Sequence, residues 1–167
     1  MSTERMPPSA HVTPFDPVDI PGKPWGTECL VAHTPYYTGK VLCRYAGATR
    51  GGLQYHRVKD ETFYLFSGEC WVYTVDQSAT PQRHKMTAGM SFHVPPGAIH
   101  SVEAITDCVF FEVSTPVFDD RVRVEEAYDL TPFGASVAAP GGNGPDTDVR
   151  LAHRLVHSPG DQPGACP

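Results

Sequence analysis

The 167-residue chain has only four lysines, no block of basic residues and no apolar run long enough to cross a bilayer. Thirteen basic against nineteen acidic residues give a formal net charge of −6 with neutral histidines. This acidic balance argues against nucleic acids and anionic membrane surfaces as partners. Residues 1–20 also lack the apolar centre of a signal peptide. We therefore expect a cytoplasmic protein whose partner is a small molecule.

Cysteine is sparse and unpatterned. The chain has five cysteines, widely spaced, and no Cys-x-x-Cys pair. An odd number at such spacings indicates neither a disulfide framework nor a redox pair. Four of the five fall in strand-like segments, where a free cysteine packs as a small apolar residue. This use of cysteine fits the cytoplasm.

Helical periodicity is nearly absent, with residues 122–128 as an exception and a short helical turn possible at residues 149–157. Short segments that alternate apolar and polar residues recur instead between Gly and Pro turns, as in residues 40–45. Such a pattern predicts many short antiparallel strands, and hence an all-β domain, over residues 21–133. Residues 1–20 carry four prolines and are predicted to form an extended arm. Residues 134–167 are rich in Gly and Pro and are predicted to be a flexible, disordered tail.

The most informative pattern is Gln54-x-His56, followed by Glu61 and, much later, by His100. Gln54 and His56 are two residues apart, so they project from the same face of a strand. Glu61 follows a charged stretch that is typical of a turn. Residues 89–100 indicate a turn, a short strand, a Pro-Pro-Gly turn and a second strand that begins near His100. Two hairpins that bring these four side chains to a shared interior predict a metal site.

These two segments resemble the paired motifs of the cupin superfamily. The first family motif is Gly, five residues, His-x-His, three or four residues, Glu, six residues and Gly. Here Gln54 stands at the first His and Gly68 at the closing Gly, with the opening Gly displaced by one residue. Ala104 replaces the final Asn of the second motif, whose other residues are in place: Gly89, Pro95, Gly97 and His100. The resemblance implies a double-stranded β-helix, the cupin or jelly-roll barrel.

The Gln at the first ligand position makes the family resemblance more specific. The segment from Gln54 to Glu61 is similar to the cupin domain of type II phosphomannose isomerases, whose metal is held by Gln, His, Glu and His. Segments 23–28, 37–42 and 112–128 also resemble those proteins, although Asp129-Leu130 replaces their usual Gly-Arg. The resemblance covers roughly residues 21–130. It also implies a homodimer, with the proline-rich arm as a segment that crosses to the partner.

The ligand types favour a borderline-to-hard divalent metal ion. Two neutral imidazoles, a carboxylate and an amide oxygen suit one Zn²⁺ per chain, with Fe²⁺, Mn²⁺ and Ni²⁺ as alternatives. Such an ion polarises a hydroxy-carbonyl compound and makes its α-proton acidic. We therefore predict a metal-dependent isomerase or epimerase acting on a sugar, sugar phosphate or similar polyhydroxylated compound. Two alternatives stay open: an Fe²⁺ oxygenase or Lewis-acid rearrangement catalyst, and a non-catalytic ligand-binding barrel.

Further candidates depend on which way their side chains face. Lys40 and Arg44 share one strand face. If it is the interior, Lys40 is a catalytic candidate and Arg44 a substrate-binding one; otherwise both are solvated. His93 is a second catalytic candidate, as a proton carrier at the rim, against a packing role. Arg123 matches an arginine of the family's closing segment and is predicted to bind substrate or to pair with a neighbouring glutamate. Val58 continues the alternation of His56 and is predicted to form an apolar wall.

Overall fold

The computed structural model describes residues 12–21 and 23–135. Regular structure within this part consists of eleven strands and two short 3-10 helices. None of its helices is long and apolar enough to cross a bilayer. The elements are β1 (Val18–Ile20), β2 (Gly26–His33), β3 (Thr38–Arg44), β4 (Gln54–His56), β5 (Glu61–Ser67), β6 (Glu69–Val75), β7 (Pro81–Thr87), β8 (Ser91–Val94), β9 (His100–Ala104), β10 (Cys108–Ser114), β11 (Arg121–Arg123), η1 (Glu125–Ala127) and η2 (Thr131–Phe133).

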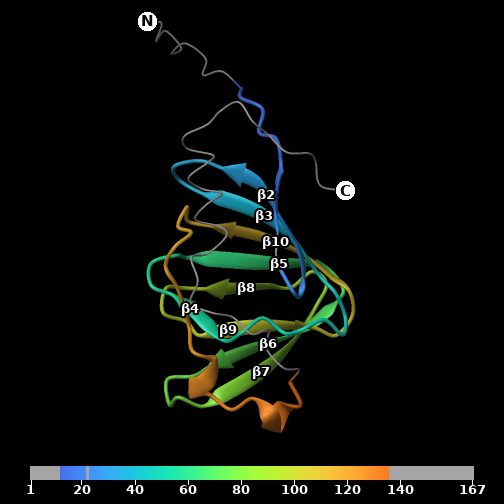
Figure 1. Ribbon diagram of the computed structural model, residues 1–167, viewed down its shortest axis with the longest axis vertical. Helices are drawn as coiled ribbons and strands as arrows, with labels where there is room; N and C mark the ends of the chain where they lie inside the picture. Colours follow the sequence, from blue (N-terminus) through green and yellow to red (C-terminus); the bar gives the residue numbers. More distant parts are fainter. Residues whose placement is uncertain (1–11, 22, 136–167) are drawn as a thin grey trace, which may run out of the picture.

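The strands form two antiparallel sheets. One sheet has the order β1-β2-β3-β10-β5-β8, and the other has the order β11-β4-β9-β6-β7. Figure 1 shows β2, β3, β10, β5 and β8 one below another, with β9, β6 and β7 beneath them. Strand β10 inserts between β3 and β5, and β9 inserts between β4 and β6. These crossovers build the predicted double-stranded β-helix, so the predicted fold class is confirmed.

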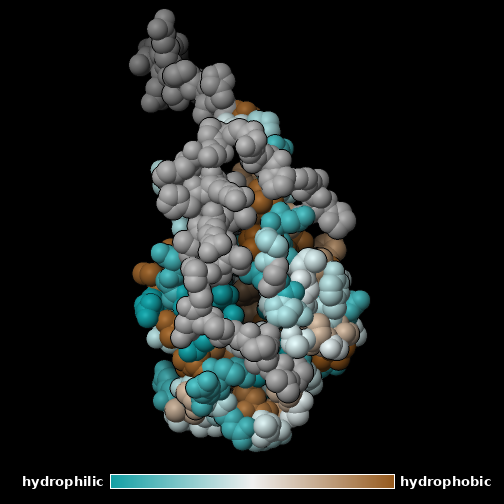
Figure 2. All heavy atoms as spheres, viewed as in Figure 1, coloured by the Kyte–Doolittle hydropathy of each residue, from teal (hydrophilic) through white to brown (hydrophobic). Residues whose placement is uncertain are grey.

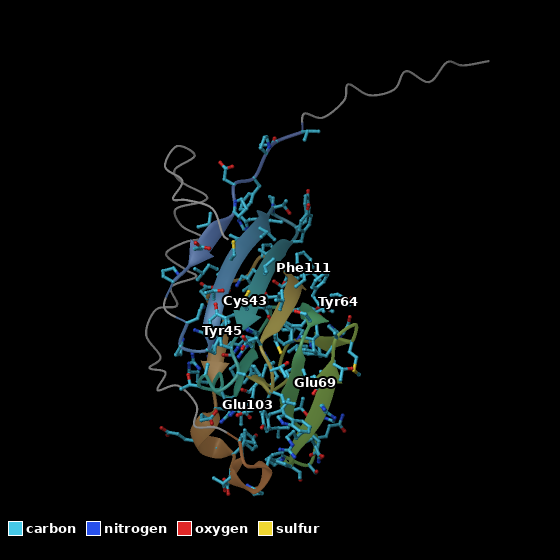
Figure 3. All side chains as sticks on the ribbon, turned by 90° about the vertical axis from the view of Figure 1, so that its right-hand side faces the viewer. Cys43, Tyr45, Tyr64, Glu69, Glu103 and Phe111 are labelled. Atoms are coloured by element: carbon cyan, nitrogen blue, oxygen red, sulfur yellow. The ribbon has the colours of Figure 1, made fainter. Side chains whose placement is uncertain are left out.

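Strict alternation along β10 separates the interior of the barrel from its surface. Phe110 and Glu112 are buried, whereas Phe111 and Val113 between and beyond them are exposed. Phe111 is level with Tyr64 of β5, and Figure 3 places both on the same side of the molecule. The outer surface of this sheet therefore carries exposed apolar side chains, while the inner surface carries both apolar and charged ones.

The apolar core fills one end of the barrel. Leu42 and Leu65, from strands on either side of β10, are level with Phe110. They pack with Val72 and Met86 of the opposite sheet in one buried cluster. Each such side chain contributes about 1.5–3 kcal/mol when it is removed from water. This cluster holds the two sheets together.

The outer surface mixes polar and apolar residues. Outside the grey atoms, the face in Figure 2 carries hydrophilic and hydrophobic side chains interspersed. Exposed apolar side chains on β5 and β10 include Tyr64, Phe66, Phe111 and Val113. An apolar sheet face is compatible with association. The homodimer stays a prediction.

The predicted segment boundaries differ from the structure in two places. Residues 18–20 of the predicted arm form β1, which pairs with β2 because Val18 and Ile20 bury their side chains against Leu30. Residues 122–128, whose periodicity suggests a helix, contain the end of β11 and the short helix η1. Residues 1–11 of the predicted arm and residues 136–167 of the predicted tail lie outside the described residues.

Candidate metal centre

Three of the predicted ligands converge at the ends of three strands. His56 ends β4, Glu61 begins β5 and His100 begins β9, and all three side chains are buried. Oε1 of Glu61 lies 3.3 Å from Nε2 of His100 and 3.6 Å from Nε2 of His56. The two imidazole rings are stacked, with centroids 6.1 Å apart. One nitrogen from each ring and one carboxylate oxygen therefore face a common point.

The second nitrogen of each ring is held by an oxygen. Nδ1 of His56 lies 2.8 Å from Oδ1 of Asp120, and Nδ1 of His100 lies 3.1 Å from the carbonyl oxygen of Ala98. If each Nδ1 carries the proton, each Nε2 presents a lone pair toward Glu61. Burial lowers the pKa of His56, which favours the neutral ring that binds metal. Both rings are thus oriented as metal ligands.

The turn before β9 fixes the position of His100. Gly97 has a φ of 83°, in the left-handed region that glycine adopts without strain. Its N–H donates to the carbonyl oxygen of His56 over 2.7 Å. The Pro-Pro-Gly turn is therefore bonded directly to the strand that carries the first histidine. The predicted order of strand, turn and strand in residues 89–100 is confirmed. The predicted hairpins are wrong, because β8 and β9, like β4 and β5, belong to different sheets.

Glu61 provides the test of whether a metal ion fits. Its Oε1 is buried and has no hydrogen-bond partner among the described residues. Such an oxygen costs about 1–3 kcal/mol unless something satisfies it. Burial raises the pKa of Glu61, but contact with His100 and the charge of Lys59 outweigh it and hold the pKa below its usual value. An ionised oxygen facing two imidazole nitrogens fits a divalent cation.

The centre opens into a cavity of about 160 Å³, here called the polar cavity. Gln54 is half-buried on β4, level with His100 of β9, and lines this cavity beside the other three predicted ligands. Lys40, Arg44 and Arg123 line it too. The face of β3 that carries Lys40 and Arg44 therefore points into the barrel. This is the first of the two predicted possibilities, the other being a solvated face.

His93 does not lie where a proton carrier for this centre was expected. It is absent from the residues described around the polar cavity, and its side chain is about half exposed. Alternation along β8 buries Val94 and turns His93 outward, where Nε2 lies 3.0 Å from Oδ1 of Asp60. His93 therefore lies on the outer side of β8, not at the rim of the site as predicted.

The prediction that Val58, in the turn between β4 and β5, forms an apolar wall of the site is wrong. Val58 is 62% exposed and forms no wall of the site, because β4 ends at His56. Oδ2 of Asp120 accepts the backbone N–H groups of Val58 and Lys59, over 2.8 and 2.7 Å. This pairing holds the turn and directs Lys59 inward.

Lys59 also belongs to the site, although the sequence did not indicate it. Its Nζ donates to Oε2 of Glu61 over 2.6 Å and to Oε1 of Glu112 over 2.7 Å. Burial lowers the pKa of Lys59, but Glu112 and Glu61 outweigh it and raise the pKa. The available signal was its spacing of two residues from Glu61, but a charged stretch between strands is usually solvated.

A second buried ion pair lies beside the first. Oε1 of Glu28 accepts from Nζ of Lys40 over 2.6 Å, and Oε2 lies 3.1 Å from Nζ of Lys23. Burial raises the pKa of Glu28, but the two lysines outweigh it and lower the pKa to about 2. The inner wall of β2, β3, β10 and β5 therefore carries a row of paired charges next to the metal centre.

The cysteines take no part in this centre. Cys43, Cys70 and Cys108 are free thiols, and burial raises the pKa of Cys70 to about 12. The strand cysteines thus pack mostly as predicted. Cys29 is the exception, because it is disulfide-bonded.

Comparison with known proteins agrees with the fold. Residues 41–114 match the family model of the cupin domain. The fold is a cupin barrel. No curated protein has a sequence that matches this chain. The finer resemblance to type II phosphomannose isomerases stays a prediction.

Solved structures give the same architecture. CapF, the capsular polysaccharide assembling protein of Staphylococcus aureus, has a TM-score of 0.58 and 19% identity over 66% of this chain and 35% of its own. KdgF from Halomonas sp. has a TM-score of 0.50 and 21% identity over 57% of this chain and 82% of its own. An RmlC-like cupin from Shewanella frigidimarina has a TM-score of 0.50 and 20% identity, covering 59% and 83%. This chain spans about a third of CapF. At these identities, the likeness establishes the fold.

Proposed function

We propose that this cupin barrel is a metal-dependent isomerase or epimerase that acts on a sugar, sugar phosphate or similar polyhydroxylated small molecule. The observation that carries the proposal is the buried Oε1 of Glu61, which has no hydrogen-bond partner among the described residues. It faces Nε2 of both His56 and His100. A divalent ion bound by these atoms, with Gln54 as the fourth ligand, satisfies all three groups. Zn²⁺ is the preferred ion, with Fe²⁺, Mn²⁺ and Ni²⁺ as alternatives.

A bound ion supplies Lewis acidity toward the carbonyl and hydroxyl oxygens of the substrate. The protein supplies orientation and proton transfer. Asp120 holds Nδ1 of His56, and Lys59 holds Oε2 of Glu61, so both ligands point into the polar cavity. Lys40, beside Glu28 in the same cavity, is proposed to exchange a proton with the substrate. Arg44 and Arg123 are proposed to bind its polar groups.

The first experiment is elemental analysis of untagged protein, with two matched variants. His56→Ala removes a proposed ligand, whereas His84→Ala removes an exposed histidine of β7. We expect about one ion per chain in the wild type and in His84→Ala, and none in His56→Ala. If reconstituted wild-type protein still contained no stoichiometric metal, the catalytic proposal would be lost and a ligand-binding barrel would remain.

The reaction class needs a separate measurement. Aldoses, ketoses and their phosphates are incubated with the metal-loaded protein in D₂O, and NMR follows solvent deuterium at the carbon next to the carbonyl. Incorporation that His56→Ala abolishes would support isomerisation. Bound iron together with oxygen uptake, and no exchange, would replace the isomerase with the oxygenase alternative.

A further inference from the structure

The chain between β10 and β11 is fastened at both ends but not in its middle. The N–H of Thr115 donates to the carbonyl oxygen of Asp60 over 3.0 Å, and the N–H of Asp60 donates to Oγ1 of Thr115 over 3.1 Å. At the other end, the carboxylate of Asp120 accepts two N–H groups of the turn after β4. Residues 116–119, here called the strap, make one hydrogen bond within the described part of the chain, from the N–H of Val117 to the carbonyl oxygen of Thr115. The strap can therefore move without breaking a hydrogen bond to the barrel.

The strap forms part of the wall of the polar cavity. Val117 lines the cavity, and Nζ of Lys40, which lines it too, lies 5.6 Å from the centroid of the Phe118 ring. The cavity has a volume of about 160 Å³, whereas pockets for small molecules usually have about 300–1,000 Å³. Outward movement of the strap would enlarge the cavity on the side of Lys40.

The ring of Phe118 makes the contacts that keep the strap against the barrel. One is the contact with the ammonium group of Lys40, at a distance typical of a cation–π interaction. The other is an edge-to-face contact with the ring of His33, with centroids 5.5 Å apart and an interplanar angle of 61°. His33 ends β2, so the strap rests on a strand of the barrel wall.

His33 contains one of the two buried side-chain atoms without a hydrogen-bond partner among the described residues. This atom is Nδ1, and the other is Oε1 of Glu61 at the metal centre. A buried nitrogen without a partner is costly, because folding has removed it from water and returned nothing. Withdrawal of Phe118 from the ring of His33 would let water reach this nitrogen. The closed position of the strap therefore carries a cost at His33.

The surroundings of His33 offer nothing to stabilise a positive charge. Thr38 of β3, level with His33, is uncharged, and β1 has no residue level with it. Lys40 lies against the ring of the strap and is paired with Glu28, while Asp119 of the strap is exposed. Burial lowers the pKa of His33 below its ordinary value of 6.5. A proton on His33 is therefore accommodated better when the strap is open.

We propose that the strap is a movable cover of the polar cavity, closed over His33 when its ring is neutral and released when the ring gains a proton. The inference rests on the proposed function in taking this cavity as the substrate site. Above about pH 6.5 the ring is neutral in both positions, so pH has no effect. Below it, the open form binds the proton first, and opening should increase by up to about tenfold for each pH unit.

NMR of the full-length, metal-free protein tests the proposal between pH 8 and pH 5. Valine methyl groups are labelled with ¹³C, and a soluble gadolinium chelate relaxes those that solvent reaches. Relaxation of Val117 should increase as the pH falls below about 6.5, while that of Val72 in the core should stay low. His33→Phe keeps an aromatic contact but takes no proton, so Val117 should stay protected at every pH. Phe118→Ala should expose Val117 at every pH, and His84→Phe, which removes an exposed histidine, is the matched control and should respond like the wild type.

The His33→Phe variant decides between His33 and other titrating groups. His56 also titrates in metal-free protein, and its Nδ1 contacts Asp120 at the end of the strap. A pH response that persisted in His33→Phe would come from such a group and would overturn the proposal. So would constant relaxation of Val117 in the wild type, or protection of Val117 in Phe118→Ala at pH 8. Elemental analysis separates the two ideas: a pH response without metal binding would defeat the proposed function alone, and stoichiometric metal without a pH response would defeat this inference alone.

Discussion

The two ends of the barrel interior are built by the same strands from opposite chemistry. On β10, Phe110 is level with Leu42 and Leu65, and all three are buried and apolar. Two residues further along, Glu112 is level with Lys40, and both are buried and charged. The strand pairing that assembles the core therefore also places the charged groups of the site. Damage at the apolar end should lower stability most and at every pH, whereas damage at the charged end should lower stability in a pH-dependent way and also affect binding.

The largest expected effect comes from the apolar end. Phe110→Ala removes a fully buried ring from the cluster that joins the two sheets and leaves a cavity, so the free energy of unfolding should fall by about 3–5 kcal/mol. Urea denaturation followed by circular dichroism measures this. Phe66→Ala, at an exposed position of β5, is the control and should change stability far less. Equal losses in the two variants would contradict the assignment of the core.

The charged end is tested next through Glu28. Glu28→Gln leaves Lys40 and Lys23 without their carboxylate, and the free energy of unfolding at pH 7 should fall by about 3 kcal/mol. The pKa of Glu28 is about 2 in the folded chain, below the ordinary value of 4.5. The unfolded chain therefore takes up the proton first on acidification, and the stabilisation is complete only above the ordinary pKa.

This difference gives a pH signature. The gap in stability between wild type and Glu28→Gln should be full at pH 7 and should shrink as the pH falls from the ordinary pKa toward about 2. Urea denaturation at pH 7, 5 and 3 measures it. A gap that stayed constant over this range would show that the ion pair with Lys40 contributes nothing.

A substitution at Asp120 tests how the ring of His56 is oriented, without removing a proposed metal ligand. Asp120→Asn weakens the interaction with Nδ1 of His56, so the affinity for Zn²⁺ should fall by about 10–100-fold. A competition titration with a chromophoric chelator measures this. Asp129→Asn, at an exposed position before η2, is the matched control and should leave affinity unchanged. An unaltered affinity in Asp120→Asn would mean that His56 is oriented by its strand alone.

The fold and the convergence of His56, Glu61 and His100 were predictable because the motifs that carry them are local in the sequence. Gln54, His56 and Glu61 lie within eight residues of one another, and the Pro-Pro-Gly turn directly precedes His100. Neither segment is the predicted hairpin, because the chain passes from one sheet to the other between β4 and β5 and between β8 and β9. The supporting contacts were not predictable in the same way. Asp120 is 64 positions from His56, and Glu112 is 53 positions from Lys59. No local alternation relates residues so far apart; only the crossovers of the barrel bring them together.

Where local alternation failed, the cause was a turn. The prediction that Val58 lines the site extended β4 by two residues, but the chain turns after His56 and exposes Val58. Val58→Thr should therefore change the free energy of unfolding by less than about 0.5 kcal/mol and leave Zn²⁺ affinity unchanged. The same denaturation and chelator titrations measure both quantities. A loss of metal affinity as large as that of Asp120→Asn would place Val58 in the wall of the site after all. If Val58→Thr behaves like the wild type, Lys59 is the residue of this turn that contributes to the site, since its side chain bridges Glu61 and Glu112.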